Sequence, residues 1–187
     1  MTRVIAGAAR GRRLAVPAGR LTRPTSDRAR EGLFGTLVAL HGPLDGACVL
    51  DLYAGSGAVG LEALSRGAGH VLLVESDPRA ARVIRDNIAA IGLPGAEVLT
   101  DRAERVLSRG PAATQKYDVV FADPPYALAG DEVSVMLNAL VKQGWLAPGA
   151  LVIVERATRS GPVTWPDGFR ADRARRYGEA TFWYGLT

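Results

Sequence analysis

Short apolar runs rich in Val and Leu alternate with segments of helical periodicity along most of this chain, and this alternation constrains the fold more than any other feature. Strands made of continuous apolar runs are typical of parallel sheets that are covered on both faces by the connecting helices. The pattern predicts an α/β protein with a doubly wound, mostly parallel sheet. The predicted strands are 48–52, 71–75, 98–100, 119–122 and 151–155, and the helices between them are 58–66, 78–91, 103–108 and 132–143.

The two ends of the chain depart from this alternation. Residues 169–177 and 181–186 surround a Gly-Glu pair and predict a C-terminal antiparallel hairpin. Near the start, apolar residues at 4–5 and 14–16 predict a short hairpin, and a helix is expected from Asp27 to near residue 41. Two glycines in this helix, at 32 and 35, are poor helix formers and leave its rigidity in question. We therefore expect a small hairpin-and-helix extension, residues 1–42, and a catalytic domain, residues 43–187.

Positive charge is concentrated at the N-terminal end. The 187-residue chain has a net charge of +4, yet residues 1–30 contain eight arginines and a single acidic residue, Asp27. A basic segment on a mildly acidic body is typical of proteins that bind a polyanion. We expect this segment to bind phosphates and its first 20 residues to be dispensable for the fold.

The composition also excludes several classes of protein. An apolar content of 48% excludes a disordered chain, and the single cysteine excludes an internal disulfide. No run approaches the roughly 20 apolar residues of a membrane span, and no signal peptide is recognisable. Neither histidine has a second ligand in register, so no metal site is expected. We predict a cytoplasmic protein without membrane contact, and a monomer because no exposed helical seam indicates a dimer.

The tetrapeptide Asp123-Pro124-Pro125-Tyr126 directly follows the predicted strand 119–122. Asp123 and the carbonyl of Pro124 offer hydrogen-bond acceptors, and the prolines stiffen the loop and carry no N–H. Tyr126 offers a flat face to a base that has left its stack. These properties predict a site that orients an exocyclic base amine for methylation. The structural alternative is a proline-stiffened strand exit with an Asp turn cap.

A glycine-rich segment, residues 51–60, lies between the first predicted strand and helix of the alternating region and contains G-x-G-x-x-G. With Glu75 twenty residues after Gly55, it satisfies the fingerprint of a nicotinamide-dinucleotide site. The alternative ligand is S-adenosylmethionine, which carries a sulfonium cation and no phosphate. Acidic residues are predicted at the carboxyl ends of four successive strands, where they would repel a pyrophosphate and attract a sulfonium. They are Asp51, Glu75, Asp101 and Asp123.

The expected roles around S-adenosylmethionine follow from this placement. Glu75 can accept hydrogen bonds from both ribose hydroxyls, and Asp101 is placed to meet the adenine amine. Gly55 and Gly57 let the backbone approach the ligand closely, with Tyr53 and Ser76 on the walls.

Several segments together resemble the RsmD family, bacterial methyltransferases that act on a guanine N2 of 16S ribosomal RNA. The similar segments are R-V-I-A-G at 3–7, R-G-R at 10–12, R-P-T-S-D-R-A-R-E-G-L-F at 23–34, D-L-Y-A-G-S-G at 51–57, Glu75, and D-P-P-Y at 123–126. The N-terminal segments distinguish this family from other methyltransferases that carry a D/N-P-P-Y tetrapeptide.

The resemblance implies a class I, Rossmann-like, S-adenosylmethionine-dependent methyltransferase fold. It implies a substrate in 16S ribosomal RNA, within the assembled or nearly assembled small ribosomal subunit. The implied cofactor-binding residues are Asp51, Tyr53, Gly55, Gly57, Glu75, Ser76, Asp101 and Arg102. The implied catalytic residues are Asp123, Pro124 and Tyr126, and the implied RNA-binding residues are Arg10, Arg12, Arg13, Arg23, Thr25, Asp27 and Arg28, with Thr25 and Asp27 beside the catalytic pocket.

Two other functions stay open at this stage. The same tetrapeptide can hold an adenine amine, which would make the protein an adenine-N6 DNA methyltransferase, although the chain leaves no room for a separate duplex-reading domain. A nonenzymatic RNA-binding assembly factor could keep this fold, although the intact Asp123 and glycine loop argue against it.

Overall fold

The computed structural model describes residues 2–17, 26–112, 115–125 and 130–187. The strands are β1 (Thr2–Arg3), β2 (Arg13–Leu14), β3 (Cys48–Leu52), β4 (His70–Glu75), β5 (Ala96–Thr100), β6 (Tyr117–Ala122), β7 (Leu146–Ala157), β8 (Arg170–Tyr177) and β9 (Ala180–Leu186). The helices are α1 (Asp27–His41), α2 (Ala58–Ser65), α3 (Pro78–Ile91), α4 (Ala103–Arg109) and α5 (Gly130–Lys142), with a short 3₁₀ turn at Thr158–Ser160. None of the helices in the described residues is long and apolar enough to cross a membrane.

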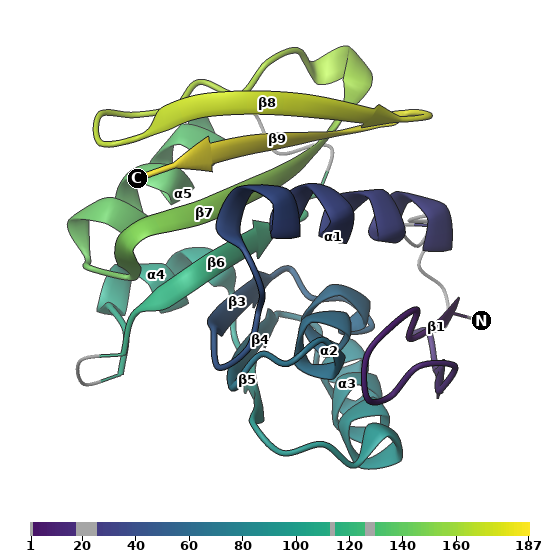
Figure 1. Ribbon diagram of the computed structural model, residues 1–187. Helices are drawn as coiled ribbons and strands as arrows, with labels where there is room; N and C mark the ends of the chain where they lie inside the picture. Colours follow the sequence, from purple (N-terminus) through teal and green to yellow (C-terminus); the bar gives the residue numbers. More distant parts are fainter. Residues whose placement is uncertain (1, 18–25, 113–114, 126–129) are drawn as a thin grey trace.

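Seven strands form one sheet in the order β5-β4-β3-β6-β7-β9-β8, and β1 and β2 form a separate pair (Figure 1). Strands β3 to β7 pair in parallel, whereas β9 is antiparallel to both of its neighbours. The predicted doubly wound sheet with a C-terminal antiparallel hairpin is therefore confirmed. The order reverses between β3 and β6, where doubly wound sheets bind ligands outside the carboxyl ends of the strands.

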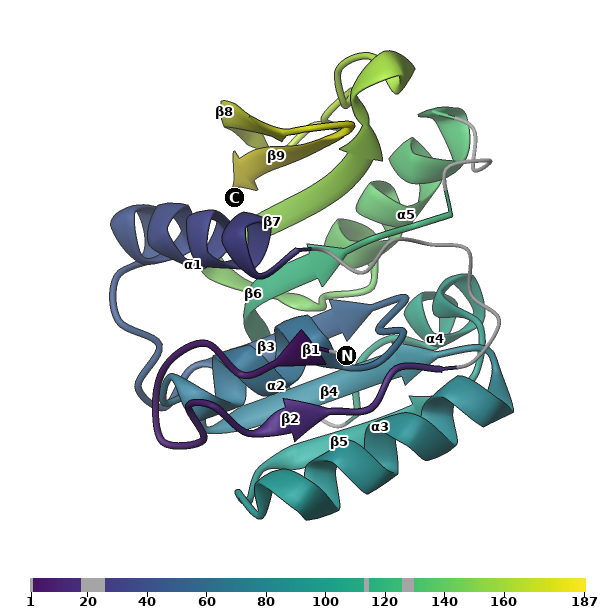
Figure 2. The same cartoon turned by 90° about the vertical axis from the view of Figure 1, so that its right-hand side faces the viewer.

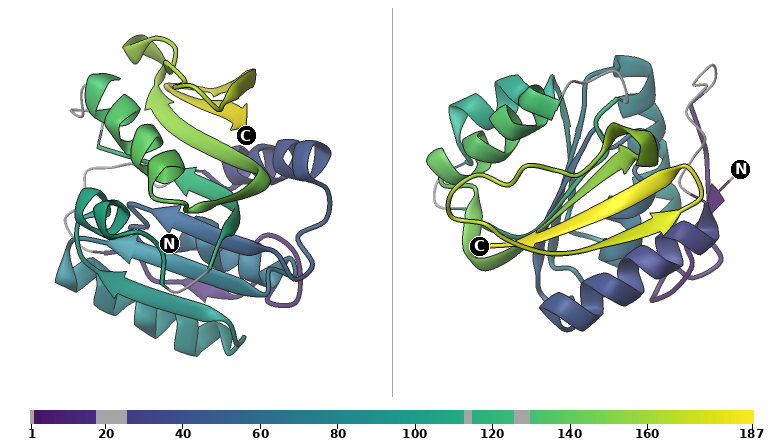
Figure 3. Two further views of the ribbon diagram at one scale, coloured as in Figure 1. Left: turned by 90° about the vertical axis from the view of Figure 1, so that its left-hand side faces the viewer. Right: turned by 90° about the horizontal axis from the view of Figure 1, so that it is seen from above.

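Helices cover both faces of the sheet, which explains why its central strands are apolar throughout. Helices α1, α2 and α3 pack on one face, together with inward residues such as Val49 and Phe121. Helices α4 and α5 pack on the other face, against residues such as Leu50 and Val120 (Figure 3). Because the two packing clusters sit on opposite faces, consecutive strand residues are buried alternately above and below the sheet.

The helix boundaries follow from local capping. The side chain of Ser26 accepts a hydrogen bond from the backbone N–H of Ala29 and begins α1. Asp77 accepts from the N–H of Arg79 and begins α3, which ends at Gly92 in the left-handed conformation. Both helices begin at the residues predicted from the sequence, Asp27 and Pro78.

Gly32 in α1 is explained by packing. A Cβ atom built there would lie 2.1 Å from the hydroxyl oxygen of Tyr177 at the end of β8. Any other residue would push Tyr177 away, so Gly32 lets α1 approach the C-terminal hairpin closely. Gly32 lowers the intrinsic helix propensity of α1, but it also allows the contact with Tyr177 that holds α1 against the hairpin.

The N-terminal hairpin differs from the prediction. The paired residues are Thr2–Arg3 with Arg13–Leu14, rather than residues 4–5 with 14–16. Val4 and Leu14 are each 1% exposed and belong to the same core cluster as the sheet. Because the backbone after Val4 bonds to a helix side chain, as described below, the pairing stops early. The N-terminal residues thus share the main core, and a boundary after residue 42 stays a prediction.

Candidate active site

The carboxyl ends of three neighbouring strands bring the predicted site residues together. Leu52 of β3 pairs with Val74 of β4 on one side and with Ala122 of β6 on the other. The residues that follow these three, Tyr53, Glu75 and Asp123, therefore lie next to one another at one edge of the sheet. The sequence prediction that the acids converge is confirmed for this part of the edge.

Asp51 is the most strongly perturbed acid of the site. Its side chain is 2% exposed, and its Oδ2 accepts a hydrogen bond of 2.8 Å from the N–H of Gly60 at the start of α2. Burial raises the pKa of Asp51 to about 7, the Gly60 bond opposes that rise, and the negative charges of Asp123 and Glu75 add to it. The three carboxylates therefore repel one another, and a cation between them would relieve the repulsion.

Glu75 is also buried, with 1% exposure, and is held by two backbone groups. Its Oε2 accepts from the N–H of Gly55 at 2.8 Å, and its Oε1 accepts from the N–H of Asp77 at 2.9 Å. These two bonds fix the direction of the Glu75 carboxylate at the carboxyl end of β4. A carboxylate can accept several hydrogen bonds, so its chemistry suits a pair of ribose hydroxyls.

The loop after β3 has an unusual backbone. Tyr53 has a φ of +61°, and it is the one residue other than glycine with positive φ in the described part of the chain. Such a conformation is strained for a residue with a Cβ and is typical of functional sites. The Tyr53 hydroxyl donates to Glu104 at 2.9 Å, which ties the loop to α4.

The three glycines of the loop serve different needs. Gly55 and Gly57 have φ of +60° and +77°, a left-handed conformation that glycine adopts without strain. A Cβ at Gly60 would lie 2.9 Å from side-chain atoms of Leu73 and Val71, so this glycine lets α2 pack closely on the sheet. The backbone therefore turns tightly beside the acids, and a Cβ at Gly57 would press against Leu73 and Ile84 of the core.

The arrangement at the start of α2 distinguishes between the two candidate ligands. A pyrophosphate binds a helix N-terminus through its free N–H groups. Here a buried carboxyl group, Asp51, already occupies the N–H of Gly60. A second anion would meet this acid, whereas a sulfonium cation would be attracted to it. The described residues fit S-adenosylmethionine and disfavour a dinucleotide.

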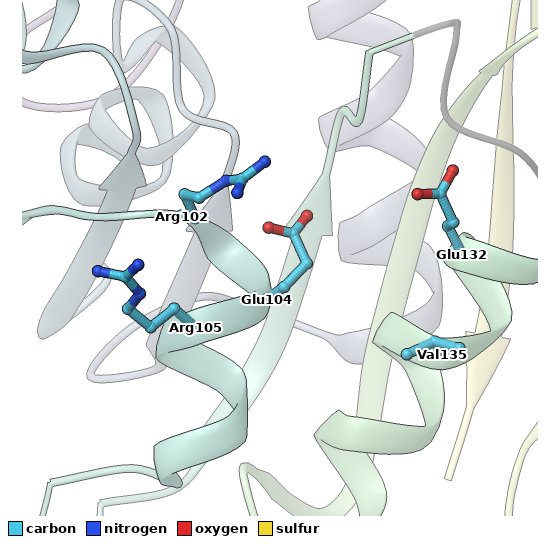
Figure 4. A pocket seen from close by; sticks show the side chains of 5 residues that line it. All are labelled: Arg102, Glu104, Arg105, Glu132 and Val135. Carbon is cyan, nitrogen blue, oxygen red and sulfur yellow. The ribbon is translucent and has the colours of Figure 1, made fainter.

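A pocket of about 370 Å³ opens between the N-terminal ends of α4 and α5. One of its lining residues, Glu104, accepts the hydrogen bond from Tyr53 in the loop after β3. Figure 4 shows its lining side chains, which are Arg102, Glu104, Arg105, Glu132 and Val135. Arg102, one of the predicted cofactor-binding residues, thus lies at the pocket. Glu104 and Glu132 were not predicted from the sequence, because their helices show only exposed charges there.

Asp101 and Ser76 occupy the ends of β5 and β4. Asp101 accepts from the N–H of Arg102 at 2.8 Å and pairs with Arg105 and Arg109 of α4 at 3.6 and 3.2 Å. Its carboxylate is therefore engaged along α4, and a contact with an adenine amine stays a prediction. Ser76 is exposed directly after β4.

On the other side of the edge lies the start of the proline tetrapeptide. The N–H of Asp123 donates to the carbonyl of Leu52 at 3.4 Å, Asp123 is half-buried, Pro124 is buried and Pro125 is exposed. Tyr126 lies outside the described residues. Asp123 is thus positioned by the central strand and is more accessible than Asp51 or Glu75.

The N-terminal arm, residues 2–17, is held by side chains that sequence reasoning missed. Glu62 of α2 is fully buried and accepts from the N–H groups of Ile5 and Ala6 at 2.7 and 3.0 Å, and from Arg66 at 2.7 Å. Ser65 accepts from the N–H of Ala9 at 2.9 Å. The available signal was Glu62 itself, the single charged residue in an otherwise apolar helix.

The other end of the arm is fixed to α3. Asn87, 2% exposed, accepts from the N–H of Ala15 at 2.8 Å and donates to the carbonyls of Ala15 and Ser56 at 3.0 and 2.9 Å. The arm is therefore bonded through its backbone and contributes to the core. The expectation that the first 20 residues are dispensable for the fold is revised, because their removal would leave Glu62 buried without these partners.

The seven residues predicted to bind RNA fall into three groups. Arg10, Arg12, Arg13 and Arg28 are exposed. Asp27 instead pairs with Arg3 at 3.3 Å and with the fully buried Arg30 at 2.7 Å, so it joins the arm to the start of α1. Arg23 and Thr25 lie outside the described residues.

Comparison with known proteins also indicates a methyltransferase. The family model "Conserved hypothetical protein 95" matches residues 2–185. The ribosomal RNA small subunit methyltransferase D of Escherichia coli K12 is 37% identical over 180 residues, which cover 96% of this chain and 87% of that protein. The protein of the same name from Haemophilus influenzae is 34% identical over 183 residues, which cover 96% and 91% of the two chains.

Solved structures agree over nearly the whole chain. The Escherichia coli protein yhhF superimposes with a TM-score of 0.84 at 34% identity, covering 98% of this chain and 96% of its own. A Thermus thermophilus protein superimposes with a TM-score of 0.80 at 35% identity and covers 98% of both chains. The sheet, the acidic edge and these similarities lead to one assignment: the chain belongs to the RsmD family of methyltransferases.

Proposed function

We propose that this protein transfers a methyl group from S-adenosylmethionine to the exocyclic N2 of a guanine in 16S ribosomal RNA. One observation carries the proposal. Asp123, which begins the proline tetrapeptide, lies at the same sheet edge as the buried carboxyl groups of Asp51 and Glu75, close enough for its charge to raise the pKa of Asp51. An acceptor for a base amine thus adjoins a site suited to a cationic methyl donor.

The cofactor side is formed by the loop after β3 and the end of β4. Bound S-adenosylmethionine would supply an electrophilic methyl group on a positively charged sulfur. Glu75, which its two backbone donors hold in place, would accept from the ribose hydroxyls. Asp51 would place negative charge near the sulfonium, and the left-handed turns at Gly55 and Gly57 would bring the backbone close to the ligand. Tyr53, Ser76, Asp101 and Arg102 complete the proposed cofactor site.

The base side is formed by the tetrapeptide. The guanine amine is a weak nucleophile, because its lone pair is delocalised into the ring. Asp123 and the carbonyl of Pro124 would accept its two N–H groups and direct the nitrogen lone pair at the methyl carbon. As the nitrogen–carbon bond forms and the carbon–sulfur bond breaks, the proton leaves to Asp123 or to water. Positioning of this kind can lower the activation free energy by about 7–11 kcal/mol.

The RNA substrate is inferred from charge and from the relatives. The exposed Arg10, Arg12, Arg13 and Arg28 can contact phosphates without reading sequence. Two relatives at 34–37% identity are named for the small-subunit ribosomal RNA. A protein of this size reads little sequence alone, so we propose that the small ribosomal subunit presents the target base, which places the reaction in the cytoplasm.

The test compares three acceptors with labelled S-adenosylmethionine: undermethylated small subunits, protein-free 16S ribosomal RNA, and plasmid DNA. Label is expected in the small subunit and not in the plasmid. Label in the plasmid would instead support the adenine-N6 DNA methyltransferase. A protein that binds RNA but labels none of the three would support the nonenzymatic assembly factor.

A further inference from the structure

The outer edge strand β8 is a second basic segment that the sequence analysis did not use. It contains Arg170, Arg173, Arg175 and Arg176 and one acidic residue, Asp172. All four arginines are exposed. Since the whole chain carries only +4, and the segment 1–30 and β8 each carry a surplus of positive charge, the rest of the molecule is net acidic. Positive charge is therefore gathered at two places.

The sheet register places one end of β8 level with Asp123. Ala122, the residue before Asp123, pairs with Val154, and the next residue of β7, Glu155, pairs with Phe182 of β9. Phe182 in turn pairs with Arg175 of β8. Arg175 thus lies in the row of Asp123, three strand spacings away, or about 14 Å across the sheet.

The two basic segments lie on opposite sides of Asp123. The arm is bonded to α2 and α3, the helices on the β3, β4 and β5 side of the sheet. Strand β8 lies beyond β7 and β9 at the other end of the sheet. In Figure 2 the arm (purple) lies in the lower half of the molecule and the β8–β9 hairpin (yellow) at its top. An RNA strand with a base at Asp123 would therefore reach basic surface in both directions.

The charge of β8 is only partly neutralised. Asp172 pairs with Arg170 and Arg173, and Arg176 donates to the carbonyl of Gly178 at 2.9 Å. Arg175 makes no ion pair with any residue that the structure describes. The strand is also held in place, because Tyr177 packs against Gly32 of α1. Arg173 and Arg175 are two residues apart and point to the same face of β8, and guanidinium groups bind phosphate oxygens through paired N–H donors.

We propose that β8 is a second RNA-binding surface, which holds backbone phosphates of the substrate on the side of Asp123 opposite to the arm. The inference rests on the proposed RNA substrate and adds where the RNA runs. Charged residues on an edge strand can also serve only to prevent pairing with another sheet, which is the competing explanation.

The experiment uses the full chain with Arg173, Arg175 and Arg176 changed to Gln. The matched control changes three exposed cations outside both basic segments, Arg79 and Arg82 of α3 and Lys142 of α5, to Gln. Binding of a small-subunit RNA fragment is measured directly at several salt concentrations, alongside thermal unfolding and S-adenosylmethionine binding. The β8 variant should bind RNA at least about tenfold more weakly than the control, with a salt slope lower by about 0.7 for each lost phosphate contact.

A second variant with the same three positions changed to Lys keeps the charge and should keep most of the salt slope. Equal RNA affinity and equal slope in the β8 Gln variant and the control would overturn the inference. So would a β8 Gln variant that self-associates in sedimentation while binding RNA like wild type, since that result identifies edge protection. RNA binding is measured without turnover. Failure of methyl transfer in wild type would therefore refute the proposed function without deciding whether β8 binds RNA.

Discussion

The acids at the carboxyl edge of the sheet differ in burial and in the backbone around them. On the proposed cofactor side, Asp51 and Glu75 are almost fully buried, and they accept from the N–H groups of Gly60 in α2 and of Gly55 in the loop after β3. On the base side, Asp123 is half-buried and is followed by two prolines that have no N–H to donate. The proposed cofactor side thus consists of buried acids held by backbone N–H groups, whereas the proposed base side presents a more accessible acid in a loop whose two prolines carry no N–H.

This difference implies that the two sides should fail in different ways. Loss of an acid on the cofactor side removes a bond within the protein as well as a contact to the ligand, so binding and stability should both fall. Asp123 is more accessible than the buried acids and is assigned to the incoming amine, so its loss should lower mainly the rate.

The largest effect is expected from Asp123→Ala. The variant should lose at least about 100-fold in kcat, as expected when a group that orients the nucleophile is removed. S-adenosylmethionine affinity should stay within about threefold, measured by calorimetry beside turnover. Asp86→Ala, at an exposed position of α3, is the matched control and should be fully active. Collapse of cofactor binding in Asp123→Ala would mean that the two sides are not separate.

Glu75→Ala should show the opposite pattern. Loss of charge-assisted bonds to ribose should weaken S-adenosylmethionine by about 1.5–3 kcal/mol, close to 10- to 150-fold in Kd. At saturating cofactor the remaining kcat should change less than in Asp123→Ala. The thermal unfolding temperature should also fall, because the N–H groups of Gly55 and Asp77 lose their acceptor. Normal cofactor affinity in this variant would move the ribose site elsewhere.

Glu62→Gln tests whether the arm belongs to the base side. An amide offers one acceptor oxygen where the carboxylate offers two, so one of the N–H groups of Ile5 and Ala6 loses its partner, at a cost of about 1–3 kcal/mol in unfolding free energy. RNA binding should weaken and S-adenosylmethionine binding should not. Glu31→Gln, on the exposed side of α1, serves as control. Equal loss of RNA and cofactor binding would show that the arm supports the whole site instead.

The smallest effect concerns pH and Asp51. Its folded-state pKa is raised to about 7 from 3.8, so its contribution to stability is complete below about pH 4 and is lost as pH rises through 7. Between pH 6 and pH 7 the loss is about 1 kcal/mol. Denaturant titrations of wild type and Asp51→Asn should differ by this slope. Parallel pH profiles for the two proteins would mean that Asp51 titrates normally.

Much of the fold could be predicted because its signals are local. The apolar runs placed the central helices and strands close to their observed bounds, except that β7 begins at Leu146, five residues before its predicted start. The register of the N-terminal hairpin could not be predicted. The backbone N–H of Ile5 bonds to Glu62, 57 residues away, and no residue near Ile5 indicates this bond. Long-range bonds between a backbone and a helix side chain leave no local pattern.

The candidate site was predictable in position but less so in detail. Parallel strands of known order place their carboxyl ends together, so the convergence of Glu75 and Asp123 followed from the alternation alone. The engagement of Asp101 by Arg105 and Arg109 depends on where the side chains of α4 point, which spacing does not determine. Burial of Asp51 likewise required the packed structure.

The central claim is methylation of a guanine N2, and the modified nucleoside tests it most directly. Undermethylated small subunits are treated with wild type and with Asp123→Ala, their RNA is digested, and the nucleosides are identified by mass and chromatographic standards. The account predicts N2-methylguanosine at one position with wild type and none with the variant. N6-methyladenosine, or a methylated guanosine that Asp123→Ala produces equally well, would contradict it.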